Sequence, residues 1–215
     1  QKITVTINGT DDKAVIGGTN AASLTEDKDV HGGQLRVDGA LSVTDADNGQ
    51  AQFNAKSLQG QFGTLSIDNL GHWIYTADNS QATIQGLKTG ESLTDTLLVH
   101  SVDGTEQQIT IIINGTDDKA VISDAQANIN LRGVTEDSGY IDTHYNLHYD
   151  GKLNIQDPDK GEGAFDPNIG SQTYQGIGYD TKLGGHILLM QDGHYTYTLD
   201  NRNIQNLAAG ETQKD

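Results

Sequence analysis

The chain has 215 residues, a formal net charge of −17 and no cysteine. This charge repels nucleic acid and anionic membrane surfaces, so neither is expected as a partner, and it disfavours self-association, so we expect a monomer. Without cysteine, an extracellular domain must be stabilised without disulfides, and a bound metal ion is one substitute. No stretch has transmembrane length, and no signal peptide is visible.

Short alternating segments bounded by Gly, Asn and Asp predict β-strands, and helical periodicity is nearly absent. In chain order the clearest strands cover residues 3–9, 34–45, 63–69, 72–78, 95–104 and 107–115. Asn69-Leu70-Gly71 and Asp103-Gly104 lie between strands and predict hairpin turns. About seven short strands per repeat at this spacing is typical of a β-sandwich.

The sequence repeats itself internally. NGTDDKAVI at residues 8–16 recurs unchanged at 114–122. Four further segments of the first half match the second half: 24–29 with 134–139, 41–53 with 153–165, 71–79 with 193–201, and 84–91 with 204–211. The repeat predicts an all-β chain of two tandem β-sandwich domains, residues 1–117 and 118–215.

The two repeats differ in two places. The second carries about ten extra residues within 166–185, which predict a loop bearing Gly and Tyr. The two strands that follow Asp95 in the first repeat have no counterpart before Asp215. Because a sandwich that lacks two strands exposes open edges and half a core, we expect a split second domain. Either another segment supplies the strands, or the chain continues after an insertion.

Acidic residues recur at fixed places in each repeat. The linker pair, the Thr-Glu-Asp motif, the Asp-x-Asp motif and the Asp-Asn pair give these candidate metal ligands in the first repeat: Asp11, Asp12, Glu26, Asp27, Asp45, Asp47 and Asp78. The second set is Asp117, Asp118, Glu136, Asp137, Asp157, Asp159 and Asp200.

An up-and-down arrangement of strands brings several of these acids to one domain junction. The expected group is Glu26, Asp27, Asp78, Asp117, Asp118, Asp157 and Asp159. Carboxylates so close repel one another, and a hard divalent cation removes that cost. Ca²⁺ takes roughly six to eight oxygen ligands, so calcium is the expected ion. The alternative is that Asp, Asn and Gly only form turns. Asp45-Asp47-Gly49 lacks the flanking helices of an EF-hand.

The Thr-Glu-Asp motif, the Asp-x-Asp-x-Gly loop and the NGTDDKAVI linker together resemble the cadherin-like, VCBS-type extender repeats of bacterial RTX adhesins. The resemblance covers the first repeat and most of the second. It implies Ig-like β-sandwiches, calcium between domains, type I secretion to the cell surface, and a role in surface attachment and biofilm formation. It also implies that neighbouring domains are partners and that a split domain can host an inserted ligand-binding module. Pro158 and Lys160 depart from the first repeat's loop.

Ligand binding by this segment itself remains an alternative function, and a purely structural surface-layer or filament protein is a third class that the charge of −17 disfavours. Five tyrosines in the second repeat predict a face that stacks on a glycan or peptide, or that packs at an edge: Tyr140, Tyr145, Tyr149, Tyr174 and Tyr179. Trp73 and Tyr75 match Tyr195 and Tyr197, and their period-two spacing predicts core positions. No nucleophile with a neighbouring base is recognisable, so an enzyme is not expected.

Overall fold

The structure is a computed structural model, and it describes residues 2–124, 134–138, 141–166, 171–173 and 176–215. The chain divides into two compact units, Gln1–Asp118 (unit 1) and Lys119–Asp215 (unit 2). Both consist almost entirely of β-strands, so the all-β prediction is confirmed. Within the described ranges, no helix combines the length and apolar character needed to cross a membrane.

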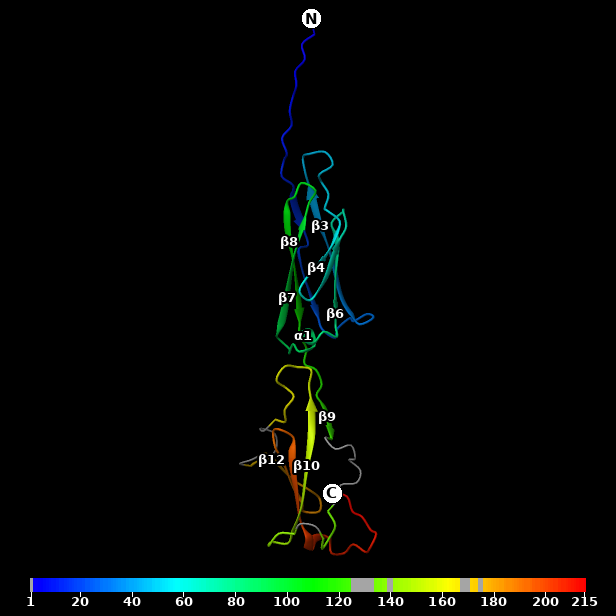
Figure 1. Cartoon of the computed structure of the whole chain (residues 1–215), viewed down its shortest axis with the longest axis vertical. Helices are drawn as coiled ribbons and strands as arrows, with labels where there is room; N and C mark the ends of the chain where they lie inside the picture. Colours follow the sequence, from blue (N-terminus) through cyan, green and yellow to red (C-terminus); the bar gives the residue numbers. More distant parts are fainter. Residues whose placement is uncertain (1, 125–133, 139–140, 167–170, 174–175) are drawn as a thin grey trace. The chain divides into compact units, whose positions relative to one another are not determined.

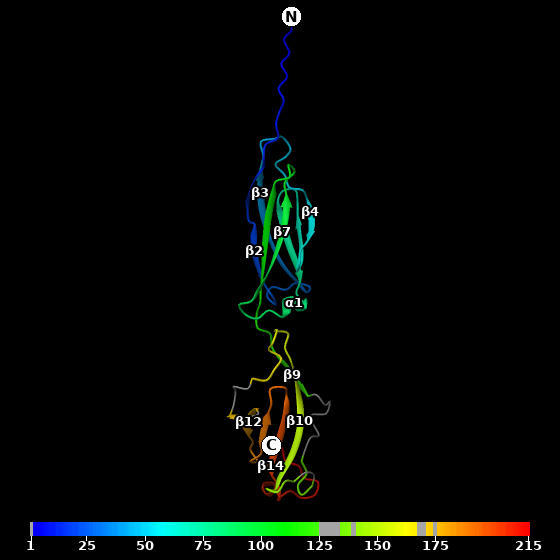
Figure 2. The same ribbon diagram turned by 60° about the vertical axis from the view of Figure 1, so that its left-hand side comes forward.

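Unit 1 is a sandwich of two sheets that face each other (Figures 1 and 2). Sheet 1 has the order β1 (Val15–Gly18), β3 (Gln34–Thr44), β6 (His72–Asp78), β5 (Gly63–Ile67) and β4 (Lys56–Gln59). Sheet 2 has the order β2 (Ala21–Thr25), β8 (Glu106–Asn114) and β7 (Ser92–His100). The short helix α1 (Ala82–Gln85) lies at the end of the sandwich where β6 ends.

Sheet 2 contains a parallel pair in an otherwise antiparallel sandwich. Strand β2 runs parallel to β8, with Ala21 opposite Thr110 and Thr25 opposite Asn114. Strand β7 then pairs antiparallel with β8 along its whole length. The last strand of unit 1, β8, is therefore hydrogen-bonded on one side to β2, the second strand of the unit, and on the other side to β7.

The core of unit 1 is built from alternate residues of the two sheets. Trp73, Tyr75 and Leu65 of sheet 1 and Ile109 and Ile111 of sheet 2 are fully buried. The period-two positions of Trp73 and Tyr75 thus point inward, as their spacing predicts. Two glycines make room for the rings: a Cβ on Gly39 would lie 2.4 Å from Trp73, and one on Gly63 would lie 2.5 Å from Tyr75.

Both hairpin turns predicted from the sequence are present. The β5–β6 turn is closed by the Gly71 N–H, which donates to the Asp68 carbonyl, and Gly71 has a φ of 90°. The β7–β8 turn has Gly104 at a φ of 88°, which an L-residue rarely adopts. Glycine is therefore required at both turns.

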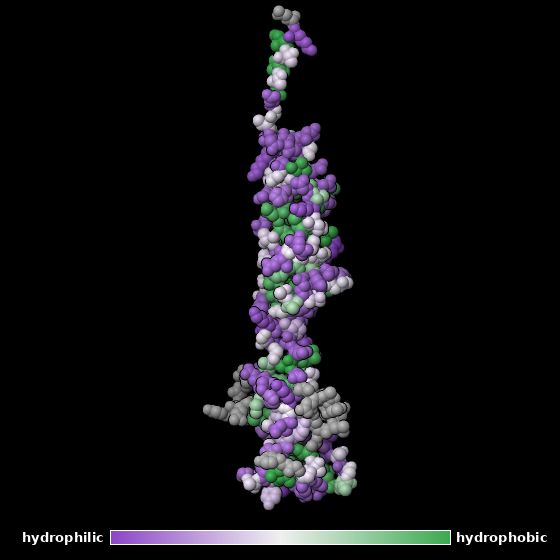
Figure 3. All heavy atoms as spheres, in the orientation of Figure 1, coloured by the Kyte–Doolittle hydropathy of each residue, from purple (hydrophilic) through white to green (hydrophobic). Residues whose placement is uncertain are grey.

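The prediction of a strand at residues 3–9 is wrong, because no strand lies within residues 2–14. A strand needs a hydrogen-bonding neighbour, and this segment has none among the described residues. Its apolar side chains are consequently exposed: Ile3 by 89%, Val5 by 77% and Ile7 by 91%. Figure 3 shows apolar and polar side chains alternating along this extended segment.

The described part of unit 2 has one sheet. Its order is β11 (Ser171–Thr173), β12 (Gly176–Asp180), β13 (His186–Leu189), β14 (His194–Asp200), β10 (Asn146–Gln156) and β9 (Val121–Asp124), followed by the 3₁₀ turn η2 (Asn201–Ile204). Residues 166–185, predicted as a loop, contain β11 and β12, which pair as an antiparallel ladder beside β13. Strand β12 takes the place beside β13 that β4 has beside β5, so β11 is the strand that the second sheet adds at its edge.

This sheet repeats sheet 1 residue by residue. Leu147 pairs with Leu199 in β10 and β14, as Leu35 pairs with Ala77 in β3 and β6. Gly151 lies opposite Tyr195, and a Cβ there would be 2.3 Å from the Tyr195 ring, which repeats the contact of Gly39 with Trp73. The sequence repeat is therefore also a structural repeat.

Candidate metal centre

The Thr-Glu-Asp motif of unit 1 follows directly on β2, and its Glu26 is completely buried. The N–H of Glu26 donates to the Asn114 carbonyl at 2.9 Å, which continues the β2–β8 ladder. Its Oε1 accepts a 2.9 Å hydrogen bond from the Thr116 N–H. The ladder between β2 and β8 thus brings the motif to the start of the linker. A buried carboxylate at this place needs positive charge or several donors to remain ionised.

Asp27 is held by two amide side chains. Its own N–H donates to Asn79 Oδ1 at 3.1 Å, and Asn79 Nδ2 donates to Asp27 Oδ1 at 2.6 Å. Gln85 Nε2 donates to the same Oδ1 at 3.0 Å. These bonds with Asn79 and Gln85 lower the pKa of Asp27, and the side chain of Asp118 also contacts it. The amides therefore occupy one carboxylate oxygen of Asp27 and hold the group ionised.

The other acids expected at this end have different partners. Asp78 Oδ1 accepts from both the N–H and the hydroxyl of Ser80, which forms the turn after β6. Asp117 Oδ1 accepts from the Thr89 N–H at 3.0 Å. Within unit 1, the structure brings Asp118 against Asp27, while Asp78 and Asp117 stabilise neighbouring turns.

Unit 2 repeats the Asp27 arrangement with other residues. The N–H of Asp137 donates to Asn201 Oδ1 at 3.1 Å, and Asn201 Nδ2 donates back to Asp137 Oδ1 at 2.7 Å. Gln205 Nε2 donates to the same oxygen at 3.1 Å. Asp27 and Asp137 both have a positive φ, 57° and 55°. We call Asn79 with Gln85, and Asn201 with Gln205, the amide clamps of the two units.

Two neighbours of the second clamp differ from unit 1. Asp200, the counterpart of Asp78, binds the guanidinium of Arg202 at 2.6 Å, which lowers its pKa. Glu136, the counterpart of Glu26, has its Oε2 buried with no hydrogen bond among the described residues. An anionic oxygen removed from water in this way is a position that a cation would fill.

The Asp-x-Asp motif of unit 1 lies at the opposite end of β3 from the Glu26 motif. Asp47 Oδ2 accepts from the Asp12 N–H at 2.6 Å, and Gln50 Nε2 donates to Asp11 Oδ1 at 2.8 Å. Asp45 Oδ1 accepts from the Asp47 N–H, whereas Asp45 Oδ2 is buried without a hydrogen bond in the described part of the chain. The first linker pair and the loop after β3 are thus brought together.

The corresponding loop of unit 2 has the most compact acidic group. Single carboxylate oxygens of Asp157, Asp159 and Glu162 all lie within 4.8 Å of one another. Asp159 is 1% exposed, and its N–H donates to Asp157 Oδ1 at 2.9 Å. Two ligands on opposite sides of Ca²⁺ are up to about 5 Å apart, so the spacing of these oxygens fits calcium.

Glu162 is absent from the ligands expected from the sequence. Glu162 corresponds to Gln50 in the first repeat. Because Gln50 is not an acid, Glu162 does not belong to the acids that recur in both repeats. The signal that would have found it is the loop itself, where Glu162 follows Asp157 by five residues and Asp159 by three.

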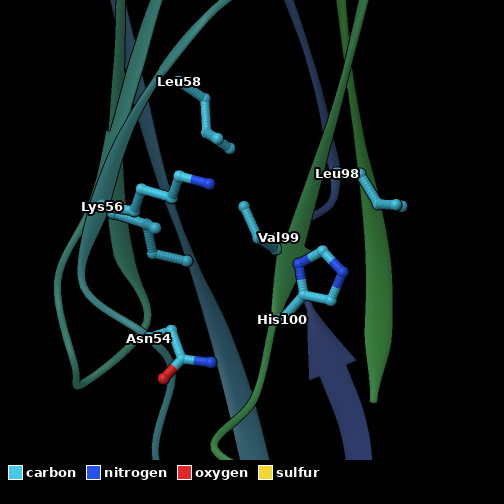
Figure 4. Close-up of a pocket in the computed structure, with 7 residues that line it drawn as sticks. Asn54, Lys56, Leu58, Leu98, Val99 and His100 are labelled. Carbon is cyan, nitrogen blue, oxygen red and sulfur yellow. The ribbon is translucent and has the colours of Figure 1, made fainter. Parts of the chain in front are cut away.

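A small hollow lies between the edges of β4 and β7 in unit 1 (Figure 4). Asn54, Lys56, Leu58, Leu98 and His100 line it, and its volume is about 110 Å³. His100 Nε2 lies 3.2 Å from Glu106, outside the lining residues. Lys56 lies on the β4 side and His100 on the β7 side, so the lining offers one amine and one imidazole.

Two of the tyrosines of unit 2 share one face of the sheet, because Tyr149 lies opposite Tyr197, and Tyr179 lies opposite Ile187, which also lies opposite Tyr197. Tyr145 is 60% exposed and lies under Arg202, whose guanidinium carbon is 5.8 Å from the ring centroid. Tyr149 packs 6.2 Å from Tyr195. Tyr179 is exposed on β12. Tyr140 and Tyr174 lie outside the described residues.

Comparison with known proteins bears on unit 1. A search of curated proteins finds no match to the chain. Residues 11–115 match the family model described as the bacterial cadherin-like domain. Domains of that kind are structural or adhesive, and they typically bind calcium. Unit 1 is therefore similar to a bacterial cadherin-like domain, which points to an extracellular role in adhesion or extension.

Proposed function

We propose that the chain is a calcium-stabilised extender segment of a large secreted bacterial adhesin of the RTX class. In this role it holds a ligand-binding module away from the cell surface during attachment and biofilm formation. The match of residues 11–115 to the bacterial cadherin-like domain supports the extender part of the proposal. The secretion route, the biofilm role and the attached module rest on the resemblance of the motifs.

One observation carries the calcium proposal: both units hold the second acid of Thr-Glu-Asp in the same amide clamp. Asn79 and Asn201 each accept from the backbone N–H of an Asp and donate to its carboxylate. A turn needs only the first of these bonds. The second bond, joined by one from a glutamine, orients a charged oxygen, which is what a metal site requires of its surroundings.

Calcium would act by linkage. The ion binds the folded carboxylate groups and not the unfolded chain, so it stabilises the folded state by RT ln(1 + [L]/Kd). Glu26, Asp27 and Asp118 at one end of unit 1, and Asp157, Asp159 and Glu162 in unit 2, are the residues that would bind it. The expectation that both groups share ions across residues 115–120 is part of the proposal.

The test is a thermal melt in millimolar Ca²⁺, in Mg²⁺ and in EDTA, combined with small-angle scattering. We expect a higher melting temperature in Ca²⁺ alone, and a more extended and stiffer particle. Glu26→Gln should weaken the response, because it removes a buried charge that calcium would neutralise. Glu106→Gln is the matched control, because Glu106 is exposed beside His100. Equal melts and equal scattering curves with and without Ca²⁺ would refute the proposal.

A second candidate is ligand binding through the exposed tyrosines. The exposure of Tyr145 and Tyr179 favours it, because an exposed ring can stack on a sugar or a peptide. Glycan and peptide arrays probed with the full chain, and with a Tyr145→Ala, Tyr179→Ala variant, test it. Binding that the double variant loses would support this candidate, and no binding to either array would exclude it.

A further inference from the structure

Unit 2 presents a sheet face that is half uncovered. This inner face includes six residues whose counterparts in unit 1 belong to the core: Leu147, Ile187, Leu189, Tyr195, Tyr197 and Leu199. Cross-strand register pairs them as Leu147 with Leu199, Ile187 with Tyr197 and Leu189 with Tyr195. Their counterparts in unit 1 are all 0–4% exposed, whereas in unit 2 only Leu147 and Leu199 are buried.

The burial of successive residues along the strands also shows that this face is partly uncovered. In unit 1, buried and exposed residues alternate along β6, so that Trp73, Tyr75 and Ala77 are buried. In unit 2, the residues from Tyr195 to Thr198 in β14 are half-buried, and so is every residue of β13. Along a strand of a sheet that has one covered face, buried and exposed residues alternate. The inner face of unit 2 therefore lacks part of the cover that unit 1 has.

Unit 1 shows what covers this face when the sandwich is complete. Leu97 and Val99 of β7 and Ile109, Ile111 and Ile113 of β8 are 0–4% exposed, and they share one core cluster with Trp73 and Tyr75. Strands β7 and β8 form an antiparallel hairpin over residues 92–114. No corresponding hairpin lies within the described residues of unit 2.

Asp215 marks where such a hairpin would enter. The hydroxyl of Tyr197 donates to Asp215 Oδ2 at 2.7 Å, and the N–H of Leu183 donates to Oδ1 at 2.8 Å. In unit 1, Tyr75 donates to Asp95 Oδ2 at 2.8 Å, and the Gln61 N–H donates to Oδ1 at 3.0 Å. Asp95 is a residue of β7, so Asp215 occupies the place of a β7 residue.

We propose that the inner face of unit 2 binds a β-hairpin of the β7–β8 type, with its first strand starting at Asp215. The partner's chemistry follows from unit 1. Apolar β-branched or leucine side chains occupy alternate positions, beginning two residues after the carboxylate, and they contact Tyr195, Tyr197 and Leu189. This inference is independent of calcium, because it rests on the apolar face alone.

The experiment appends a copy of residues 96–114 directly after Asp215 in the full chain. We expect hydrogen exchange at the backbone amides of β13 and β14 to slow by about tenfold or more, since covered strands open less often. Trp73 emission reports on unit 1 and should melt as before, because it is the single tryptophan and lies in unit 1.

Two control chains keep the test specific. In the first, Thr replaces the copies of Leu97, Val99, Ile109, Ile111 and Ile113, so the strands remain while the apolar face is lost. In the second, one Ser is inserted after Asp215, which turns the apolar side chains away from the sheet. If both controls slow exchange as much as the matched copy does, the proposal is overturned.

A second copy of the chain is the competing occupant. Residues 1–8, QKITVTIN, follow the pattern of β8 residues 107–114, QQITIIIN, and Ile3, Val5 and Ile7 are exposed. Sedimentation of the unmodified chain tests this outcome. A dimer that deletion of residues 1–8 abolishes, together with faster exchange in β14, would assign the face to a second copy and overturn the proposal. A monomer with unchanged exchange after the deletion supports it.

Discussion

The hydroxyl of Tyr75 donates a 2.8 Å hydrogen bond to Oδ2 of Asp95 inside the core of unit 1. Asp95 is 3% exposed, and it also accepts from the N–H groups of Gln61 and Phe62. Burial acts to raise the pKa of Asp95, but these donors outweigh it, so the pKa is lowered. Burial and the neighbouring carboxylate raise the pKa of Tyr75. The pair thus joins the two sheets through one charged acceptor.

Tyr75→Phe should destabilise unit 1 by about 1.5–3 kcal/mol, because a buried charged acceptor loses a donor. The measurement is urea unfolding followed by Trp73 emission. Tyr197→Phe is the matched control, since it removes the corresponding bond to Asp215 in unit 2. That variant should leave the Trp73 transition unchanged, and an equal shift in both variants would show that the bond has no local effect.

The same pair predicts a pH dependence. The pKa of Asp95 is lower in the folded state than in the unfolded chain, whose aspartates titrate near about 3.9. Its contribution is therefore fully present above about pH 4, and it is lost as the pH falls through the folded pKa. In EDTA, the stability difference between the parent chain and Tyr75→Phe should shrink below pH 4. A difference that stays constant down to pH 2 contradicts this account.

The amide clamp of unit 1 should be required for tight calcium binding. Asn79→Ala removes the donor to Asp27 Oδ1, so the carboxylate is no longer oriented, and we expect affinity to fall by about tenfold. Isothermal titration with Ca²⁺ measures this. Asn69→Ala is the control, because Asn69 is an exposed turn residue. Equal affinities for the two variants would show that the clamp serves the turn alone.

Glu162→Gln should weaken calcium binding by about tenfold, because the acidic group of unit 2 loses one of its three charges. Glu211→Gln removes a charge from an exposed residue of the same unit and should change nothing. Titration of both variants at equal ionic strength separates the local ligand from the general effect of charge. A fall of the same size in both would point to general screening.

Gly39→Ala should destabilise unit 1 by about 1–3 kcal/mol, because the added methyl would lie 2.4 Å from the Trp73 ring and force it to shift. Thermal melting by circular dichroism and by Trp73 emission measures the effect. Gly9→Ala is the matched control, since no atom lies within 4 Å of the Cβ it would add. Similar melting temperatures for the two variants would mean that the ring yields freely.

Short-range signals predicted much of unit 1 correctly. Alternation located β3, β5, β6, β7 and β8, and glycine with Asn or Asp located the turns at Gly71 and Gly104. These features depend on residues close in the chain, so the sequence contains them directly. The segment at residues 3–9 shows the limit, because alternation creates a strand only where a neighbouring strand exists.

The candidate site was predictable in its charges but not in its amides. Asn79 and Gln85 recur between the repeats as the acids do, but they are common surface residues, and they meet Asp27 only through the turn after β6. Sequence spacing also placed Asp78 with Asp27, but its carboxylate turns to Ser80 and the next residue, Asn79, makes the contact. A shift of one residue at a strand end redirects the side chain, and period alone does not resolve it.

The parallel pairing of β2 with β8 determines how unit 1 carries a pulling force. Tension between β2 and β8 slides the two strands along each other, so the hydrogen bonds from Ala21–Thr110 to Thr25–Asn114 share the load together. In a hairpin pulled open from its end, the bonds break one at a time and each bears the full load. Unit 1 should therefore resist tension until these hydrogen bonds break together, so its strength depends on the length of the β2–β8 ladder.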